Sequence, residues 1–418
     1  MNTESQAAPT IHETVVPTNT TVCVLGLGYI GLPTASVLAT KGFRVHGMDV
    51  RPEVVDTINA GRIHIEEPDL DIVVRSAVNS GQLKAGYEPQ PADIFILCVP
   101  TPIRDDKSPD LSYVEQAARA IQPHVKPGNL IILESTSPPK TTENVVVPLA
   151  IPDGMVVGED VFVAHCPERV LPGRILLEVV QNDRVVGGVT SACTEKALAF
   201  YKAFVNGKVL ATSAIAAEVT KLVENSYRDV NIAFANELSI LADKLGVDPW
   251  EIIELANRHP RVNILSPGPG VGGHCISVDP WFLIHASSED TPLIRMAREV
   301  NDAKPHHVVA HIKELSQRFA APKIGCLGIT YKADVDDLRE SPALDIVQAL
   351  HDDDVGHIMP CDPYISSDRF TDFPLYDLND VIEQCDILVL LTDHQQFKSV
   401  PLRVLQERVI VDTRGIWR

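Results

Sequence analysis

A glycine-rich turn between a strand and a helix, close to the start of the chain, most constrains the fold. The apolar stretch Thr21–Leu25 leads into the run Gly26-Leu27-Gly28-Tyr29-Ile30-Gly31, and a helical pattern follows to about Lys41. A second strand, at residues 43–48, ends at Asp49, which lies about 20 residues beyond the second glycine. This order predicts a βαβ unit that binds a dinucleotide at the turn.

Each glycine of the turn has its own expected task. Gly26 makes the turn, Gly28 leaves room for the pyrophosphate, and Gly31 lets the helix pack closely on the strand. The start of the helix supplies N–H donors and a positive field to the phosphates, which places Tyr29 and Ile30 beside them. We therefore predict that these residues bind the cofactor.

The acid at the end of the second strand indicates which dinucleotide is bound. Asp49 can accept hydrogen bonds from both ribose hydroxyls and would repel a 2′-phosphate, which favours NAD over NADP. Arg51 lies two residues further on and leaves that preference open. The alternative interpretation is a tight turn followed by a solvated aspartate.

The rest of the chain alternates between strand and helix patterns, with a helical middle. Long helices are expected from about residue 216 to 241 and near 292–307. A second α/β pattern begins at Pro322 and repeats the order strand, loop, helix, strand, acid, the acid being Asp362. We predict an α/β fold with two Rossmann-like doubly wound domains, joined by a long central helix and a helical middle domain. The expected divisions are a flexible tail at 1–20, an NAD-binding domain at 21–205, a central helical domain at 206–310 and a C-terminal α/β domain at 318–418.

Composition excludes several classes of protein. The 418 residues carry a formal net charge of −20, which makes nucleic acid or an anionic membrane an unfavourable partner. No segment approaches the roughly 18 to 20 apolar residues that span a bilayer, and the N-terminus has no signal-peptide pattern. The eight cysteines show no metal-like or CxxC spacing, which predicts a reducing cytoplasm and no metal site.

A cysteine follows a second glycine-rich loop. Cys275 ends the run Gly268-Pro269-Gly270-Val271-Gly272-Gly273-His274-Cys275, which cannot form a helix or strand interior. Such a loop lets backbone approach a ligand, and a thiol that opens a helix beyond it would have its thiolate favoured. Beside a nucleotide-binding fold, this predicts oxidation through a covalent sulfur intermediate. A small buried thiol in a tight loop is the alternative.

Three further polar residues could take part in the chemistry. Lys221 and Asn225 are four residues apart in the long helix and share a face, where they could stabilise an alkoxide. Glu168, in His165-Cys166-Pro167-Glu168-Arg169, could activate water beside a cleft. A solvated helix face and an inert glutamate at a strand end are the alternatives.

Seven motifs in this order resemble the UDP-glucose/GDP-mannose dehydrogenase family, and the resemblance covers nearly the whole chain from about Thr21 to Arg418. They read GLGYIGLP, CVPTP, ESTSPP, CPERVLPG, EVTKLVENSYRDVNIAFANE, GPGVGGHCISVDP and GITYKADVDDLRESP. Within the family, CPERVLPG, RHPRVNILSPGPGVGGHC and DPWF are most similar to the members that oxidise UDP-N-acetylmannosamine.

The resemblance implies a four-electron oxidation of a sugar 6-hydroxyl to a carboxylate, with two NAD consumed. Lys221, Asn225 and a water bound to Asp279 would handle the O6 proton in the first oxidation. Cys275 would capture the aldehyde as a thiohemiacetal and carry the later thioester. Water activated near Glu168 would hydrolyse that thioester.

The resemblance also implies contacts for cofactor, substrate and partner subunit. Thr101 and Thr136 would border the nicotinamide, Arg339 would contact the cofactor, and Arg261 would reach the partner's site in a homodimer. The implied substrate-binding residues, in addition to Glu168, Lys221, Asn225 and Arg261, are Arg169, Val170, Arg228, His259, Gly272, Tyr331 and Lys332.

The choice of sugar is less constrained than the reaction. Glucose-specific members have an aromatic residue, a leucine and an acid after the glutamate, whereas this chain has Arg169-Val170-Leu171-Pro172-Gly173. This difference favours a 2-acetamido sugar, and the configuration at C2 is not readable from residues. UDP-N-acetylglucosamine, UDP-glucose, a simple two-electron dehydrogenase and a non-catalytic nucleotide-sugar-binding regulator are the other interpretations.

Overall fold

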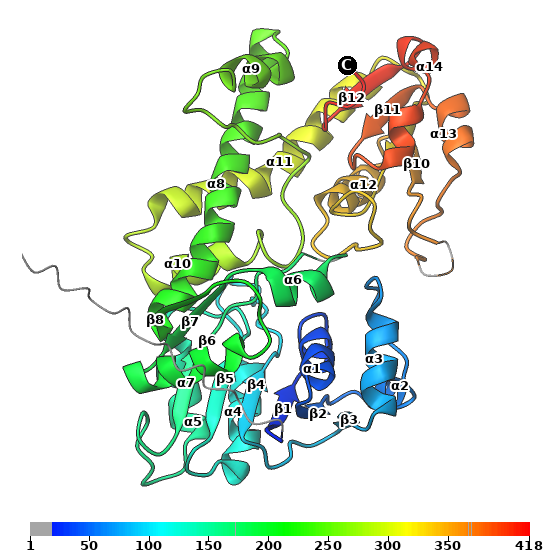
Figure 1. Ribbon diagram of the computed structural model, residues 1–418. Helices are drawn as coiled ribbons and strands as arrows, with labels where there is room; N and C mark the ends of the chain where they lie inside the picture. The colour runs from blue at the N-terminus through cyan, green and yellow to red at the C-terminus, as the bar shows by residue number, and fades with distance from the viewer. Residues whose placement is uncertain (1–18, 172, 367, 369) are drawn as a thin grey trace, which may run out of the picture. The chain divides into compact units, whose positions relative to one another are not determined.

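The computed structural model describes residues 19–171, 173–366, 368 and 370–418 (Figure 1). The tail expected at residues 1–20 lies outside the described residues, apart from its last two. Two compact units make up the chain: unit 1 extends from Met1 to Lys221 and unit 2 from Leu222 to Arg418.

Unit 1 is built on an eight-stranded sheet. Its strands are β1 (Thr21–Leu25), β2 (Arg44–Met48), β3 (Leu83–Gly86), β4 (Ile94–Leu97), β5 (Leu130–Leu133), β6 (Phe162–His165), β7 (Arg184–Gly188) and β8 (Val209–Ser213). The spatial order is β3-β2-β1-β4-β5-β6-β7-β8. All neighbouring strands are parallel except β6 and β7, which pair antiparallel. The strand order reverses direction next to β1, so the carboxyl end of β1 lies at the topological switch point where ligands bind in such sheets.

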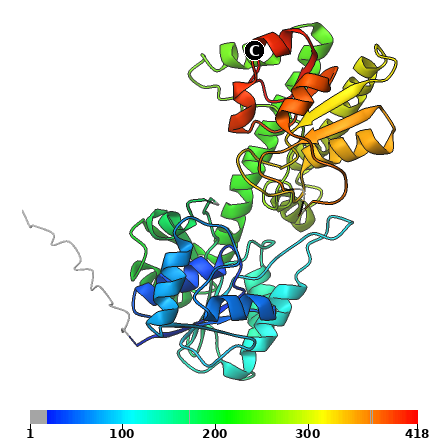
Figure 2. The same ribbon diagram turned by 90° about the vertical axis from the view of Figure 1, so that its right-hand side faces the viewer.

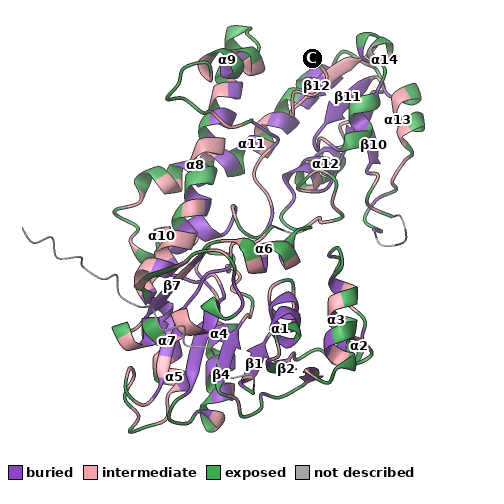
Figure 3. Ribbon diagram, viewed as in Figure 1, coloured by how far each residue is buried: buried purple, intermediate pink, exposed green. Residues whose placement is uncertain are grey.

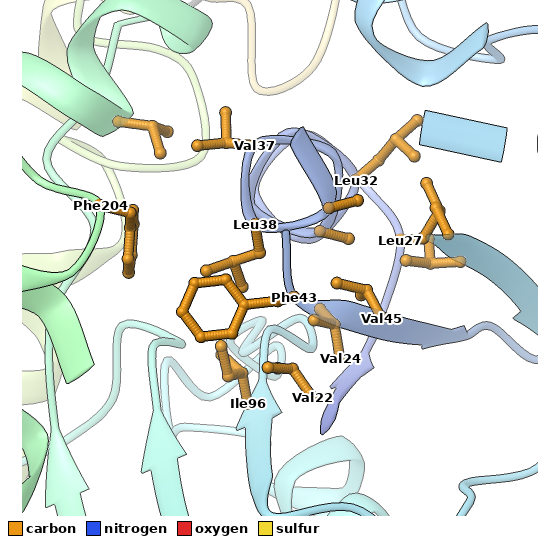
Figure 4. Packing of buried hydrophobic residues seen from close by; sticks show 14 of the residues in the cluster. Val22, Val24, Leu27, Leu32, Val37, Leu38, Phe43, Val45, Ile96 and Phe204 are labelled. Atoms are coloured by element: carbon orange, nitrogen blue, oxygen red, sulfur yellow. The ribbon is translucent and has the colours of Figure 1, made fainter. Parts of the chain in front are cut away.

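Helices cover both faces of this sheet because its strands are apolar on both sides. Val22 and Val24 of β1 belong to one buried cluster, whereas Cys23 and Leu25 belong to the cluster on the other face. Figure 4 shows the first cluster, with Val22 and Val24 beneath Leu38. The helices of this unit are α1 (Gly31–Thr40), α2 (Pro52–Asn59), α3 (Leu70–Asn79), α4 (Ser112–Ile121), α5 (Val147–Ala150), α6 (Ile175–Gln181) and α7 (Ser191–Lys202).

Unit 2 combines long helices with a second sheet. Its helical part comprises α8 (Ala214–Leu245), which begins in unit 1, and α9 (Pro249–Ala256), α10 (Asp279–Ala286) and α11 (Pro292–Ser316). Strands β9 (Lys323–Leu327), β10 (His357–Cys361), β11 (Ile387–Leu390) and β12 (Val409–Asp412) form a parallel sheet in the order β10-β9-β11-β12 (Figures 1 and 2). Helices α12 (Pro342–Asp352), α13 (Leu378–Gln384) and α14 (Leu402–Gln406) accompany it. The strands of both sheets are largely buried (Figure 3).

Buried hydrogen bonds and an ion pair join α8 to α11 along part of their length. The bonds are Arg298 Nη1 to Asp229 Oδ1 (2.6 Å), Asn236 Nδ2 to Asn301 Oδ1 (2.9 Å) and Lys304 Nζ to Ser239 Oγ (2.7 Å). All six residues are buried. Buried polar groups need such partners, so these bonds constrain how the two helices pair.

The predicted fold class is confirmed, and two helices differ from their expected bounds. The helix expected at 292–307 continues through Pro305 to Ser316. Its last turns bury Val308, Ile312 and Leu315 in the core of the second sheet, and this packing outweighs the missing proline N–H. The long helix ends at Leu245, four residues after the expected bound.

Among the described residues, no helix is long and apolar enough to cross a membrane.

The buried ammonium of Lys304 predicts a pH dependence of stability. Burial lowers the pKa of Lys304 from its ordinary 10.5 to about 8, although Asp243 acts in the opposite direction. Unfolding therefore takes up a proton between these values, and stability due to this group rises as pH increases from 8 to 10. We expect wild type to gain about 2 kcal/mol relative to Lys304→Met over this range.

Urea denaturation followed by tryptophan fluorescence measures this gain, because all three tryptophans, Trp250, Trp281 and Trp417, lie in unit 2. A stability difference between the two proteins that does not change with pH would contradict the prediction.

Candidate active site

The glycines after β1 are required for different reasons. Gly26 has a φ of +88°, and a Cβ there would lie 2.4 Å from the carbonyl oxygen of Cys98. A Cβ on Gly31 would lie 1.7 Å from the carbonyl oxygen of Gly26, whereas a Cβ on Gly28 would meet no atom within 4 Å. Packing therefore demands the first and third glycines. The middle glycine faces open space, which is what a pyrophosphate at this turn needs.

The start of α1 and the end of β2 border the same glycine turn. Ile30 precedes the helix without a side-chain cap, so the first N–H groups of α1 are not used by a capping side chain. Asp49 is 7% exposed, and its Oδ2 accepts a bond from Leu27 N (3.1 Å). Its Oδ1 accepts from Arg51 N (3.0 Å) and Arg51 Nε (3.3 Å). These residues fit a dinucleotide: the turn would hold the pyrophosphate and Asp49 the ribose.

Two threonines predicted to border the nicotinamide lie together in unit 1. Thr101 follows β4 and Thr136 follows β5, at the carboxyl ends of adjacent parallel strands. Thr101 Oγ1 donates to the carbonyl oxygen of Thr136 at 2.5 Å. The sequence places the two threonines 35 residues apart, and the strand pairing brings them into contact.

Glu168 is held more firmly than a solvated glutamate at a strand end would be. It is 7% exposed, and its Oε2 accepts from Arg184 Nη1 at 2.6 Å. Its Oε1 accepts from the backbone N–H of Arg169 at 2.6 Å. The Arg169 side chain donates to the carbonyl oxygen of Asp183 (3.3 Å), and Val170 packs against the sheet core.

On α8, the Asn225 side chain forms hydrogen bonds to an arginine and to an aspartate. Asn225 is 1% exposed; its Nδ2 donates to Asp279 Oδ2 (2.5 Å) and its Oδ1 accepts from Arg228 Nη2 (2.5 Å). A guanidinium can only donate and a carboxylate only accept, so the amide has a single orientation. Lys221 lies one turn earlier on the same helix and is half-buried. The structure thus joins Asn225, Arg228 and Asp279, which the sequence separates by up to 54 positions.

Cys275 is exposed and lies in the turn before α10, not at the start of the helix. The expectation that the thiol opens a helix is therefore corrected, since α10 begins only at Asp279. The carbonyl oxygen of Cys275 accepts from Asp279 N (2.9 Å) and Val278 N (3.2 Å). The backbone of this turn therefore links Cys275 to Asp279, the acid that binds Asn225.

The glycines before Cys275 allow close packing within the protein. A Cβ on Gly272 would lie 2.2 Å from the carbonyl oxygen of Glu340, and one on Gly273, whose φ is +82°, would lie 2.7 Å from the ring of Tyr331. Contact with the loop after β9 therefore accounts for these two glycines. The expectation that this loop approaches a ligand stays a prediction.

The other predicted ligand-binding residues of unit 2 are exposed. Arg339 donates to both carboxylate oxygens of Asp337, through Nε (2.8 Å) and Nη2 (2.6 Å). Lys332 is exposed, and its carbonyl oxygen accepts from a neighbouring threonine. His259 and Arg261 lie in the loop after α9, where Arg261 N donates to His259 Nδ1 (3.3 Å).

The second sheet repeats the turn-and-acid arrangement of the first. Asp362, at the end of β10, accepts from Ile329 N at 2.8 Å, as Asp49 accepts from Leu27 N. Its Oδ2 also lies 3.1 Å from Nε2 of the fully buried His394. Because Nδ1 of His394 accepts from Asp334 N (2.9 Å), the ring proton is on Nε2.

The sequence analysis missed His394 and Arg184. The available signal for each was a polar residue next to or within a buried apolar strand. His394 follows β11, and Arg184 is the first residue of β7.

Three family models match the chain in order. The NAD binding domain of the UDP-glucose/GDP-mannose dehydrogenase family matches residues 20–205, its central domain 215–303, and its UDP binding domain 325–418. The chain belongs to the UDP-glucose/GDP-mannose dehydrogenase family. Its members are NAD-dependent nucleotide-sugar dehydrogenases, so this dehydrogenase uses NAD and carries a UDP-sugar-binding domain.

Several relatives of this dehydrogenase are similar over almost their whole length. An NDP-N-acetyl-D-galactosaminuronic acid dehydrogenase from Ralstonia nicotianae is 53% identical, with 95% of this chain and 96% of the relative covered. A UDP-N-acetyl-D-mannosamine dehydrogenase from Campylobacter jejuni is 50% identical, with 91% and 96% covered. Among solved structures, the UDP-N-acetyl-mannosamine dehydrogenase Cap5O from S. aureus is 43% identical, with 95% of each chain covered and a TM-score of 0.88.

Two glycine substitutions in this dehydrogenase should separate packing from cofactor binding. Gly28→Ala adds a methyl group in open space and should leave the melting temperature unchanged. The same methyl group would occupy the predicted pyrophosphate position and weaken NAD binding at least about tenfold, or roughly 1.4 kcal/mol. Calorimetric titration with NAD measures this loss.

Gly31→Ala is the matched control, because its methyl group would clash with the carbonyl oxygen of Gly26. It should lower the melting temperature. Unchanged NAD affinity in Gly28→Ala would refute the placement of the pyrophosphate.

Proposed function

We propose that this dehydrogenase oxidises the 6-hydroxyl of UDP-N-acetyl-D-mannosamine to the uronate through a thioester on Cys275. The observation that carries the proposal is an exposed thiol one turn away from the buried Asn225–Asp279 pair. The printed names of the relatives from C. jejuni and S. aureus support the choice of sugar.

In the first oxidation, the chain must take a proton from O6 and stabilise the negative charge that develops there. Lys221 supplies a cation and Asn225 a neutral dipole on the same face of α8. The 2.5 Å bond to Asp279 holds the Asn225 amide, and Asp279 would accept the O6 proton through a water. Bound NAD accepts the hydride in each of the two oxidations.

In the second oxidation, the Cys275 sulfur adds to the aldehyde carbon, and its proton passes to the carbonyl oxygen to give a thiohemiacetal. Loss of a hydride and of the hydroxyl proton leaves a thioester. Water then attacks the thioester carbonyl, gives up a proton to Glu168 and releases the Cys275 thiol and a carboxylate. Covalent capture keeps the aldehyde bound between the two oxidations.

The remaining contacts and divisions belong to the same proposal. The turn at Gly26–Gly31, Asp49 and Thr136 would hold NAD, while Tyr331 and Lys332 would bind the nucleotide sugar. The domain boundaries at 21–205, 206–310 and 318–418, a homodimer in which Arg261 reaches the partner's site, and a cytoplasmic location are further parts of it. The family-model ranges support the domain boundaries, and the spacing of the cysteines supports the location.

A galacto-configured 2-acetamido sugar is the second candidate substrate. It is favoured by the 53% identity to the R. nicotianae relative, whose name specifies N-acetyl-D-galactosaminuronic acid. Both candidates share the acetamido group and the same chemistry at C6, and they differ in configuration on the sugar ring. Arg169 and Val170, which replace the glucose-specific pattern, are compatible with either.

The test measures NADH formed per nucleotide sugar consumed. We expect two NADH per UDP-N-acetylmannosamine and little turnover of UDP-N-acetylgalactosamine, UDP-N-acetylglucosamine or UDP-glucose. Cys275→Ser should lose overall turnover by at least about 100-fold because serine is a far weaker nucleophile. Cys385→Ser, which changes a buried thiol in the second sheet, is the matched control and should keep activity.

Two outcomes would contradict the proposal. One NADH per sugar, or an active Cys275→Ser variant, would remove the thioester. Faster turnover of the galacto-configured sugar would keep the chemistry and replace the substrate.

A further inference from the structure

A buried arginine lies beneath the carboxylate that the proposed function assigns to thioester hydrolysis. The side chain of Arg184 is 2% exposed and that of Glu168 is 7% exposed. Arg184 Nη1 donates to Glu168 Oε2 at 2.6 Å, and Arg184 Nη2 donates to the carbonyl oxygen of Val179 at 3.2 Å. Both terminal nitrogens of the guanidinium therefore have an acceptor, and the Glu168 carboxylate is bound to one of them.

The antiparallel pairing of β6 and β7 produces this contact. His165 of β6 pairs with Gly187 of β7, so residues that follow β6 lie beside the first residues of β7. Glu168 follows β6 by three positions, and Arg184 precedes Gly187 by three. The sheet register therefore aligns the acid with the base.

A second carboxyl group lies in the same buried region, with different partners. Glu134 is 2% exposed; its Oε1 accepts from Tyr201 OH (2.6 Å) and its Oε2 from Cys98 Sγ (3.3 Å). Burial raises the pKa of Glu134, and the Glu168 charge adds to this effect while Arg184 opposes it. The Arg184 guanidinium acts electrostatically on Glu134, whereas its ion pair is with Glu168.

Three further titratable groups in this buried region are neutral at pH 7. They are Cys98, Cys166 and Tyr201, and burial raises the pKa of each, to about 12 for Cys166. Burial by itself would lower the pKa of Arg184, but the Glu168 carboxylate raises it well above its ordinary value. Arg184 is therefore a buried cation bound directly to Glu168.

We propose that Arg184 is a positioning residue for hydrolysis: it holds the Glu168 carboxylate in one orientation, so that Glu168 accepts the proton of the attacking water. The inference rests on the proposed function. Among the described residues, each Glu168 oxygen accepts one bond, to Arg184 or to Arg169 N, and a carboxylate oxygen can accept two. One acceptor site on each oxygen remains for water. The water forms the new C–O bond, its proton passes to Glu168, and the C–S bond to Cys275 breaks with the electron pair returning to sulfur.

A purely structural ion pair is the competing explanation, since many buried pairs contribute nothing to chemistry. The two differ in which step they affect. Loss of a structural pair would lower stability and slow all steps together. Loss of a positioning residue slows hydrolysis alone, after both oxidations have occurred.

The experiment mixes Arg184→Gln rapidly with NAD and the nucleotide sugar that wild type oxidises. We expect a burst of two NADH per active site at the wild-type rate, followed by steady-state turnover about 100-fold slower. Mass spectrometry of the quenched enzyme should show the acyl adduct on Cys275.

Two further variants make the test specific. Arg184→Lys retains a positive charge but lacks the two guanidinium nitrogens that bind Glu168 and Val179, so it should recover part of the hydrolysis rate. It replaces Arg184→Gln in the test if that variant does not fold. Arg75→Gln, which breaks the exposed pair with Asp71 in the same unit, is the matched control and should behave as wild type.

Parallel loss of burst and turnover, or wild-type hydrolysis in either Arg184 variant, would overturn the inference. If wild type forms only one NADH per sugar, or if Cys275→Ser keeps its turnover, the proposed function fails, and this result is distinguishable from failure of the Arg184 step.

Discussion

One polar face of helix α8 carries the contacts on which the candidate site of unit 2 depends. Asn225 on this face binds Asp279, and Asp229 binds the buried Arg298 of α11. Further along, Asn236 Oδ1 accepts from the backbone N–H of Gly268, the first residue of the loop that ends at Cys275. The same helix thus holds the acid, the second long helix and the base of the thiol loop. Because buried polar groups need partners in defined directions, these contacts fix the register of all three.

A second constraint appears in both sheets, where an acid after one strand accepts an N–H from the turn after its neighbour. Asp49 and Leu27 form this contact in unit 1, and Asp362 with Ile329 forms it in unit 2. The surroundings then differ. Asp49 is bonded to the exposed Arg51, whereas Asp362 faces the fully buried His394. The same backbone arrangement therefore occurs at the turn predicted to bind NAD in the first sheet and at a turn beside a buried histidine in the second.

The local parts of the molecule were the most predictable. The strand Thr21–Leu25 and the glycine turn were expected where they occur, because their signals lie within a few consecutive residues. The second α/β half was recognisable for the same reason, since its order repeats that of the first. Strands β3, β7 and β8 were not expected. Their sequences, LKAG, RVVGG and VLATS, are not continuous apolar runs, and pairing in the sheet rather than residue pattern makes them strands.

Motifs and local periodicity are enough to identify the family, the class of fold and the types of residue available for chemistry. Which of those residues meet depends on the tertiary structure. The pairing of Glu168 with Arg184 follows from the antiparallel register of β6 and β7, and that of Asn225 with Asp279 joins α8 to the first residue of α10. The glycines beside Cys275 pack closely on Glu340 and Tyr331, which the sequence did not indicate. Each of these contacts joins segments far apart in the chain, and burial and sheet register, not sequence spacing, set their geometry.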